Sequence, residues 1–260
     1  MKIRISALVL GLLMMGLTAC GNGQGDSDAA DGQTVEQADT LSSPGATEGP
    51  EMVYASHILI PFQGCQQAPA DAMTREEAFQ LLSSIADSIA AGQITFAQGA
   101  ARHSSCPSSE QGGFLGGFMR GQMVPEFENV AFNLQPGMVS GVFETGYGYH
   151  IVYREPSVTA SHILVAYQGA ERSSATRTQE EALQLIETIR DSIDSGELGF
   201  EDAALRYSDC PSGQEGGDLG PFSRHIMTPS FEDAAFALEV GDISGIVETP
   251  FGYHLIKRTE

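Results

Sequence analysis

The pattern of apolar and polar positions predicts the same set of elements twice after residue 52. An apolar run that is typical of a strand opens each set, at 53–60 and at 158–167. A helix with one apolar face follows each strand, because apolar residues recur there every three or four positions. These positions are Ala78, Leu81, Leu82, Ile85 and Ile89 in the first set and Ala182, Leu185, Ile186, Ile189 and Ile193 in the second.

Capping residues give the limits of these helices. Thr precedes Glu by three residues at 74–77 and at 178–181, which is the capping-box signature of a helix start. Gly92 and Gly196 are suited to end the two helices. Further short helices are expected at 96–103 and 200–207, and from Pro125 and Pro229 onward. Strands are expected at 139–144, 149–153, 243–248 and 253–257.

The two sets are copies of one sequence unit. Ala55-Ser56-His57-Ile58-Leu59 returns 105 residues later as Ala160-Ser161-His162-Ile163-Leu164, and Gly148-Tyr149-His150 returns 104 residues later as Gly252-Tyr253-His254. A period of this length matches a small domain rather than a solenoid unit. We therefore predict two tandem α+β domains, residues 52–155 and residues 156–260.

The first twenty residues are typical of a secretion signal. Lys2 and Arg4 precede an apolar run over 5–17, which is short for a membrane span. The ending Leu17-Thr18-Ala19-Cys20 resembles a bacterial lipobox, which implies a lipoprotein signal peptide at 1–19 and a lipid anchor on Cys20. A retained transmembrane helix and an ordinary secreted protein with an incidental Cys20 are the two alternatives.

Charge excludes one class of partner and defines a linker. The chain has 34 Asp and Glu residues against 13 Lys and Arg, so it repels polyanions, and we expect no nucleic-acid partner. Residues 21–51 contain seven acidic residues and no Lys, Arg, Phe or Tyr. Such a stretch buries too little apolar surface to fold, so we predict an acidic flexible tether over residues 20–51.

The repeated motifs resemble those of the parvulin-type peptidyl-prolyl isomerases. They are the Ala-Ser-His-Ile-Leu runs, Tyr207-Ser208-Asp209-Cys210, Gly216-Gly217-Asp218-Leu219-Gly220-Pro221-Phe222, Phe231-Glu232-Asp233-Ala234-Ala235-Phe236 and Phe251-Gly252-Tyr253-His254. The resemblance covers each repeat almost from end to end. It implies a small, mainly antiparallel four-stranded sheet flanked by helices in each domain, and an activity that needs no cofactor and no metal.

The resemblance also implies a site in each repeat. Its substrate pocket would consist of Leu115, Met123 and Phe127 in the first repeat and Leu219, Met227 and Phe231 in the second. Its catalytic positions would be His57, Cys106, Thr145 and His150 in the first repeat and His162, Cys210, Thr249 and His254 in the second. A covalent role for the thiols is one interpretation. The other is that sulfur adjusts the electrostatics while the histidines form a hydrogen-bonded scaffold.

The repeats differ, and if only one of them turns over substrate we expect it to be the second. Phe114 stands in the first repeat where the second has Asp218. Cys65 has no counterpart in the second repeat, and a disulfide from Cys65 to Cys106 is one hypothesis.

Phosphate-directed members of the family carry a basic cluster after the first strand. Neither 61–64 nor 166–169 contains a cation, so a phosphoserine-proline preference is not expected.

These features predict an isomerase that acts on proline-containing, unfolded exported proteins from a lipid anchor in the cell envelope. A holdase chaperone that uses both apolar pockets as peptide clamps is the first alternative. An architectural lipoprotein that keeps the fold without the activity is the second. An assay of prolyl isomerisation separates the isomerase from the holdase chaperone.

Overall fold

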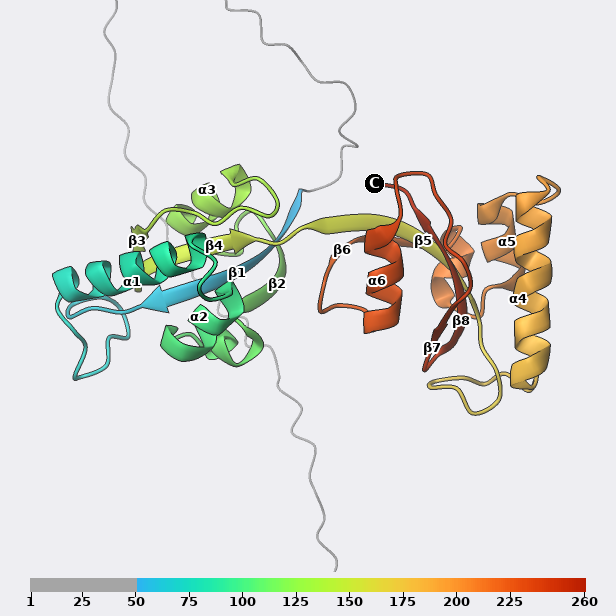
Figure 1. Ribbon diagram of the computed structural model, residues 1–260, viewed down its shortest axis with the longest axis horizontal. Helices are drawn as coiled ribbons and strands as arrows, with labels where there is room; N and C mark the ends of the chain where they lie inside the picture. Colours follow the sequence, from blue (N-terminus) through green and yellow to red (C-terminus); the bar gives the residue numbers. More distant parts are fainter. Residues whose placement is uncertain (1–50) are drawn as a thin grey trace, which may run out of the picture. The chain divides into compact units, whose positions relative to one another are not determined.

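A computed structural model describes residues 51–260 of the chain. The predictions for the signal peptide at 1–19, for Cys20 and for the tether up to residue 50 lie outside these residues. Two four-stranded antiparallel sheets are present, with strand orders β2-β1-β4-β3 and β6-β5-β8-β7 (Figure 1). The predicted α+β class with an antiparallel four-stranded sheet in each repeat is confirmed.

The two repeats contain the same elements in the same order. The first has β1 (Met52–Ile60), α1 (Arg75–Ala90), α2 (Phe96–His103), the 3₁₀ helix η1 (Pro107–Gln111), β2 (Phe114–Met119), α3 (Pro125–Asn133), β3 (Phe143–Thr145) and β4 (Gly148–Arg154). The second has β5 (Ser157–Val165), α4 (Gln179–Asp194), α5 (Phe200–Tyr207), η2 (Pro211–Glu215), β6 (Asp218–Ser223), α6 (Pro229–Ala237), β7 (Val247–Thr249) and β8 (Gly252–Arg258).

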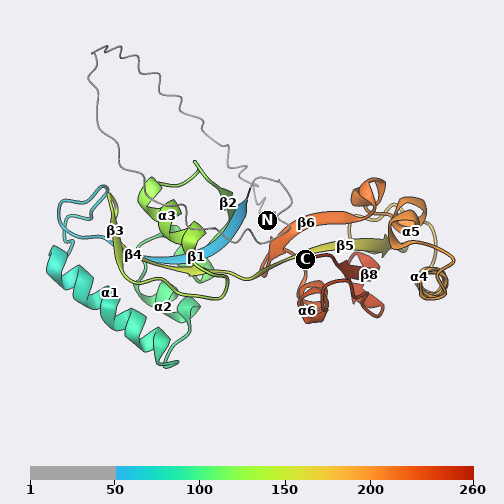
Figure 2. The ribbon, with the colours of Figure 1, turned by 90° about the horizontal axis from the view of Figure 1, so that it is seen from above.

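Each sheet is covered on both faces by helices. In the first repeat α1 and α2 lie on one face and α3 lies on the other, as Figure 2 shows. Side chains alternate between the faces along a strand, so Ile58 and Ile60 pack against α1 while Val53 and Ala55 pack against α3. The second repeat separates its core in the same way. Each sheet therefore has one face that meets a single short helix, and the site lies there.

The long helices begin where the capping residues predicted. The Thr74 hydroxyl accepts a hydrogen bond from the Glu77 N–H, and the Glu77 carboxylate accepts one from the Thr74 N–H. Thr178 and Glu181 form the same capping box. These caps satisfy backbone donors that have no partner within the helix.

One glycine in each repeat lets the chain approach the first strand of the sheet closely. The φ angles of Gly113 and Gly217 are +89° and +87°, a region that side chains disfavour. A Cβ atom on Gly217 would lie 2.3 Å from the carbonyl oxygen of His162, and one on Gly113 would lie 2.5 Å from that of His57. The His162 N–H in turn donates to the Gly217 carbonyl over 2.8 Å. The glycines therefore permit the close approach that holds the site histidine.

Gly217→Ala is expected to destabilise the second repeat by at least about 2 kcal/mol, because it combines backbone strain with a clash against His162. Gly220→Ala is the matched control. Gly220 also has a positive φ, of +64°, but no neighbouring atom lies within 4 Å of its Cβ position. Urea unfolding of both variants checks the prediction, and equal losses in the two would contradict it.

Two predicted strands are shorter than the sequence indicates. The run 139–144 forms a ladder only at Phe143–Thr145, and Val139 makes an isolated bridge to Tyr153. The Ser140 hydroxyl accepts a hydrogen bond from the Val152 N–H and thereby replaces part of the ladder. The run 243–248 behaves in the same way, with strand only at Val247–Thr249 and a bridge from Ile243 to Lys257. Among residues 51–260 no helix has the length and apolar character needed to cross a membrane.

Candidate active site

The register of β1 and β4 brings the two histidines of the first repeat together. His57 pairs with Val152 and His150 pairs with Leu59, so the histidines are diagonal neighbours on one face. Their Nδ1 atoms lie 3.4 Å apart, and the His150 Nε2 lies 2.9 Å from the Thr145 hydroxyl oxygen. That oxygen also accepts from the Tyr147 N–H over 3.1 Å. A hydrogen-bonded chain therefore runs from a turn through both rings.

The second repeat contains the same chain of hydrogen bonds, with shorter contacts between its two histidines and between His254 and Thr249. The Nδ1 atoms of His162 and His254 lie 3.1 Å apart, and the His254 Nε2 lies 2.8 Å from the Thr249 hydroxyl oxygen. The Phe251 N–H donates to that oxygen over 3.1 Å. The free end of the chain is the buried Nε2 atom of His162, which has no protein partner among the described residues, as is also true of His57.

The four histidines of the two sites are neutral at pH 7. Burial lowers the pKa of His57 and that of His162 to about 4. Burial also lowers the pKa of His150 and that of His254 to about 3, and the neighbouring histidine contributes in each case. Neutral rings can donate and accept along the chain, which suits the scaffold role better than acid-base chemistry near pH 7.

Apolar side chains form the floor of each site. The Phe231 ring meets His162 and His254 edge-on, with centroid distances of 5.6 Å and 5.3 Å. Phe127 makes the same contacts with His57 and His150, at 5.6 Å and 5.8 Å. Leu115 and Met123 pack with Phe127, as Leu219 and Met227 pack with Phe231. The hydrogen-bonded Thr-His-His side chains thus lie directly against the apolar floor.

The structure brings the predicted residues of the second repeat together around one cavity of about 720 Å³. The lining includes all seven of them, which are His162, Cys210, Leu219, Met227, Phe231, Thr249 and His254. A volume of this size is within the usual range of small-ligand pockets and exceeds the needs of one pyrrolidine ring. It leaves room for the residues that flank a proline.

A buried carboxylate holds the backbone of the methionine in each site. The Glu232 Oε1 accepts hydrogen bonds from the N–H groups of Ile226 and Met227, both over 2.9 Å. Glu128 accepts from the Met123 N–H over 2.9 Å. Hydrogen bonds donated by Gly121 and Met123 hold the pKa of Glu128 below its usual value. Sequence reasoning missed these carboxylates, although each follows a pocket phenylalanine directly.

The cysteines occupy equivalent positions before the 3₁₀ helices. The Ser108 hydroxyl donates to the Cys106 sulfur and the Ser212 hydroxyl donates to the Cys210 sulfur, both over 3.3 Å. Cys65, Cys106 and Cys210 are free cysteines, so the hypothesised disulfide between Cys65 and Cys106 is not formed. Cys65 instead packs beside the apolar core under α1.

Sequence reasoning also missed the ion pair that Arg177 forms with Asp209, a residue that lines the second cavity. Both residues are replaced in the first repeat, by Ser105 and Met73 respectively. That difference between the copies was the available signal.

The fold and the two sites define a class. Each repeat combines a four-stranded antiparallel sheet with a buried, hydrogen-bonded set of one threonine and two histidines. An apolar floor and a free cysteine accompany this set in each repeat. Sequence comparison then gives the family. The model of the rotamase family, described as the PPIC-type PPIase domain, matches residues 57–156 and 162–260. The chain belongs to this family and is a parvulin-type peptidyl-prolyl cis-trans isomerase with two such domains.

Three relatives illustrate the similarity. The peptidyl-prolyl cis-trans isomerase Pin1 of Malus domestica is 46% identical over 112 residues, which are 39% of this chain and 93% of the relative. The chaperone SurA of Nitrosospira multiformis is 31% identical over 217 residues, which are 79% of this chain and 47% of SurA. The chain therefore matches less than half of that chaperone. The solved peptidyl-prolyl isomerase PrsA of Bacillus anthracis is 40% identical, covers 40% of this chain and 41% of PrsA, and gives a TM-score of 0.33.

Proposed function

We propose that the chain catalyses isomerisation of X-Pro bonds in unfolded exported polypeptides, with the second repeat as the more active site. The cavity beside Phe231 is the observation that carries this proposal, because it combines an apolar floor with the neutral His162–His254 pair. We take residues 52–155 and 156–260 as the two domains. The signal at 1–19 and acylation of Cys20 would hold them in the cell envelope on an acidic tether.

The reaction needs no covalent intermediate. Amide resonance sets a barrier of about 18–20 kcal/mol to rotation, and each reduction of about 1.4 kcal/mol accelerates rotation tenfold. Leu219, Met227 and Phe231 would hold the pyrrolidine ring in surroundings that exclude water. A dry site weakens the charge-separated resonance form of the planar amide and so favours the twisted one. The catalyst only has to bind the twisted amide better than either planar form.

Neighbouring side chains have supporting roles in this mechanism. The hydrogen-bonded Thr249–His254–His162 chain would fix the floor under the twisting bond, and burial would keep both rings neutral. Cys210 lines the cavity as a free thiol and would adjust the electrostatics near the rotating carbonyl. The first repeat would act through His57, His150, Thr145 and Cys106 in the same way.

A protease-coupled assay on an X-Pro tetrapeptide tests the activity of the full chain. Met227→Ala should lower kcat/KM of the second site by about 10- to 100-fold, because one apolar contact in a pocket contributes about 1–3 kcal/mol. Met123→Ala is the matched change in the first site and should lower the total rate less. Unchanged kcat/KM in the chain that carries both substitutions would contradict the proposal.

A holdase is the second candidate, favoured by the similarity to the chaperone SurA over 79% of the chain. Here the two apolar pockets would bind unfolded segments without turnover, and tandem display would add avidity. Suppressed aggregation of an unfolded client by a chain without isomerase activity would favour this function.

A further inference from the structure

The second cavity has one wall made by a loop. Residues 166–177 join β5 to α4, and Glu171, Arg172, Ser173, Ser174 and Ala175 from this loop line the cavity. The lining also includes Asp209, Cys210 and Pro211, which follow α5. The width of the cavity therefore depends on how the loop is held against the segment that carries Cys210.

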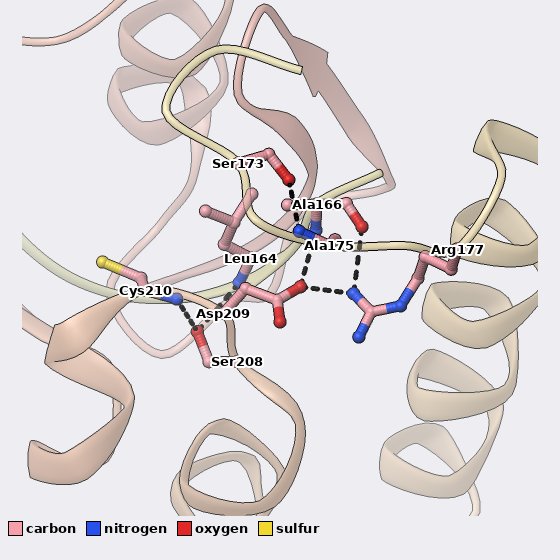
Figure 3. Close-up of polar contacts among 8 residues, drawn as sticks. All are labelled: Leu164, Ala166, Ser173, Ala175, Arg177, Ser208, Asp209 and Cys210. Atoms are coloured by element: carbon pink, nitrogen blue, oxygen red, sulfur yellow. Dashed lines mark hydrogen bonds and ion pairs between the residues drawn. The ribbon is translucent and has the colours of Figure 1, made fainter. Parts of the chain in front are cut away.

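Asp209 connects the segment that carries Cys210 to both ends of this loop, at Ala166 and Arg177. The Asp209 Oδ2 accepts a hydrogen bond from the Ala166 N–H over 2.8 Å and forms an ion pair with the Arg177 guanidinium (Figure 3). The Arg177 Nη1, which takes part in this ion pair, also donates to the Ala166 carbonyl over 2.9 Å. Asp209 and Arg177 thus satisfy both polar groups of the Ala166 backbone, and we call this three-residue set the clamp.

The clamp is tied to the thiol beside it. The Asp209 N–H donates to the Leu164 carbonyl over 2.8 Å. The Ser208 hydroxyl accepts from the N–H groups of Leu164 and Cys210, over 3.1 Å and 3.3 Å (Figure 3). Because Cys210 follows Asp209 directly, any shift of the clamp displaces the thiol relative to the loop.

The first repeat lacks all three members of the clamp. Pro61 stands in place of Ala166 and has no N–H to donate, while Ser105 replaces Asp209 and Met73 replaces Arg177. Met73 packs against the apolar core under α1 together with Cys65. The backbone contacts at the loop ends are nevertheless the same, since Gln63 N–H donates to the Met73 carbonyl as Gln168 N–H donates to the Arg177 carbonyl.

We propose that Asp209 and Arg177 are positioning residues, which hold the loop 166–177 at the distance from Cys210 that the substrate peptide requires. The first repeat anchors its loop by apolar packing instead. The proposal rests on the proposed isomerase function of the second cavity. It predicts that the peptide affinity of the second site depends on the ion pair and that the peptide affinity of the first site does not.

The test uses the full chain with Met123→Ala, so that turnover reports on the second site. Arg177→Met and Asp209→Ser introduce the residues of the first repeat. Each should raise KM by about tenfold with little change in kcat, since the loop contacts the flanks of the peptide rather than the rotating bond. The double variant should lose little more than either single variant, because the two side chains act as one unit. Arg177→Lys retains a cation and should restore most of the affinity.

Asp233→Asn is the control, because it breaks an ion pair of 2.8 Å with Arg224 on the exposed side of α6 and should change neither constant. Hydrogen exchange should become faster in residues 166–177 of both clamp variants and stay unchanged in the control. Unchanged KM and unchanged exchange in the clamp variants would overturn the proposal. Absence of any turnover in the Met123→Ala chain, with faster exchange in the clamp variants, would instead refute the isomerase function of the second cavity and with it this catalytic role.

Discussion

Replacing Phe231 by alanine is expected to lower kcat/KM of the second site by about 100-fold and to destabilise that repeat by about 3–5 kcal/mol. The ring is 4% exposed and belongs to the core that joins α6 to the sheet. It also contacts both site histidines and Phe222, whose centroid lies 6.1 Å away. Its removal therefore opens the floor of the cavity and a void in the core together.

Two further variants separate these effects. Phe231→Leu keeps an apolar side chain in the core, so it should recover most of the stability while kcat/KM stays at least about tenfold low. Val240→Ala alters an apolar side chain that is 64% exposed and should change neither quantity. Urea unfolding and the peptide assay are the two measurements. Wild-type turnover by a folded Phe231→Ala protein would exclude this ring from catalysis.

Acidification from pH 6.5 toward pH 4 is expected to destabilise both repeats. The pKa values of His162 and His254 are about 4 and about 3 in the folded protein, below the ordinary value of 6.5. In this window the unfolded chain binds protons that the folded protein does not, so stability present above pH 6.5 is lost as pH falls. The loss approaches about 1.4 kcal/mol per pH unit for each buried histidine. His57 and His150 act in the same direction.

Urea unfolding at several pH values between 7 and 5 checks this prediction. The double substitution His162→Gln with His254→Gln should reduce the pH dependence of the second repeat and leave that of the first unchanged. Turnover of the wild-type protein should stay constant from pH 6 to 8, because the four histidines remain neutral throughout. A bell-shaped profile in that range would indicate acid-base chemistry instead.

The helices were predictable because local signals define them. The capping boxes at 74–77 and 178–181 start α1 and α4 in the structure, and Pro125 and Pro229 start α3 and α6. The edge strand β2 (Phe114–Met119) was not recognised from its own residues. Two glycines interrupt its alternation, and its pairing with β1 depends on contacts distant in the sequence. The 3₁₀ helices were missed for a similar reason, since five residues carry little periodicity.

The site residues were predictable where both repeats carry them. The histidines, Thr249 and the apolar floor recur in both copies, and the structure brings those of the second copy to one cavity. Asp209 was recognised only as part of the motif at 207–210 and Arg177 was given no role, because a search for repeated residues overlooks an interaction present in one copy only. Their partnership also joins residues 32 positions apart through the backbone of Ala166, which no local pattern reveals.

The close approach of Gly113 and Gly217 to the site histidines limits how the two copies can diverge. The loops beside the sites differ in length by one residue, and one is held by charge where the other is held by apolar packing, yet both copies have glycine at this position, 113 and 217. Any larger residue there would push against the carbonyl group of the neighbouring histidine. Selection for new clients can therefore act on the rim of each site, while the two glycine positions tolerate no larger residue.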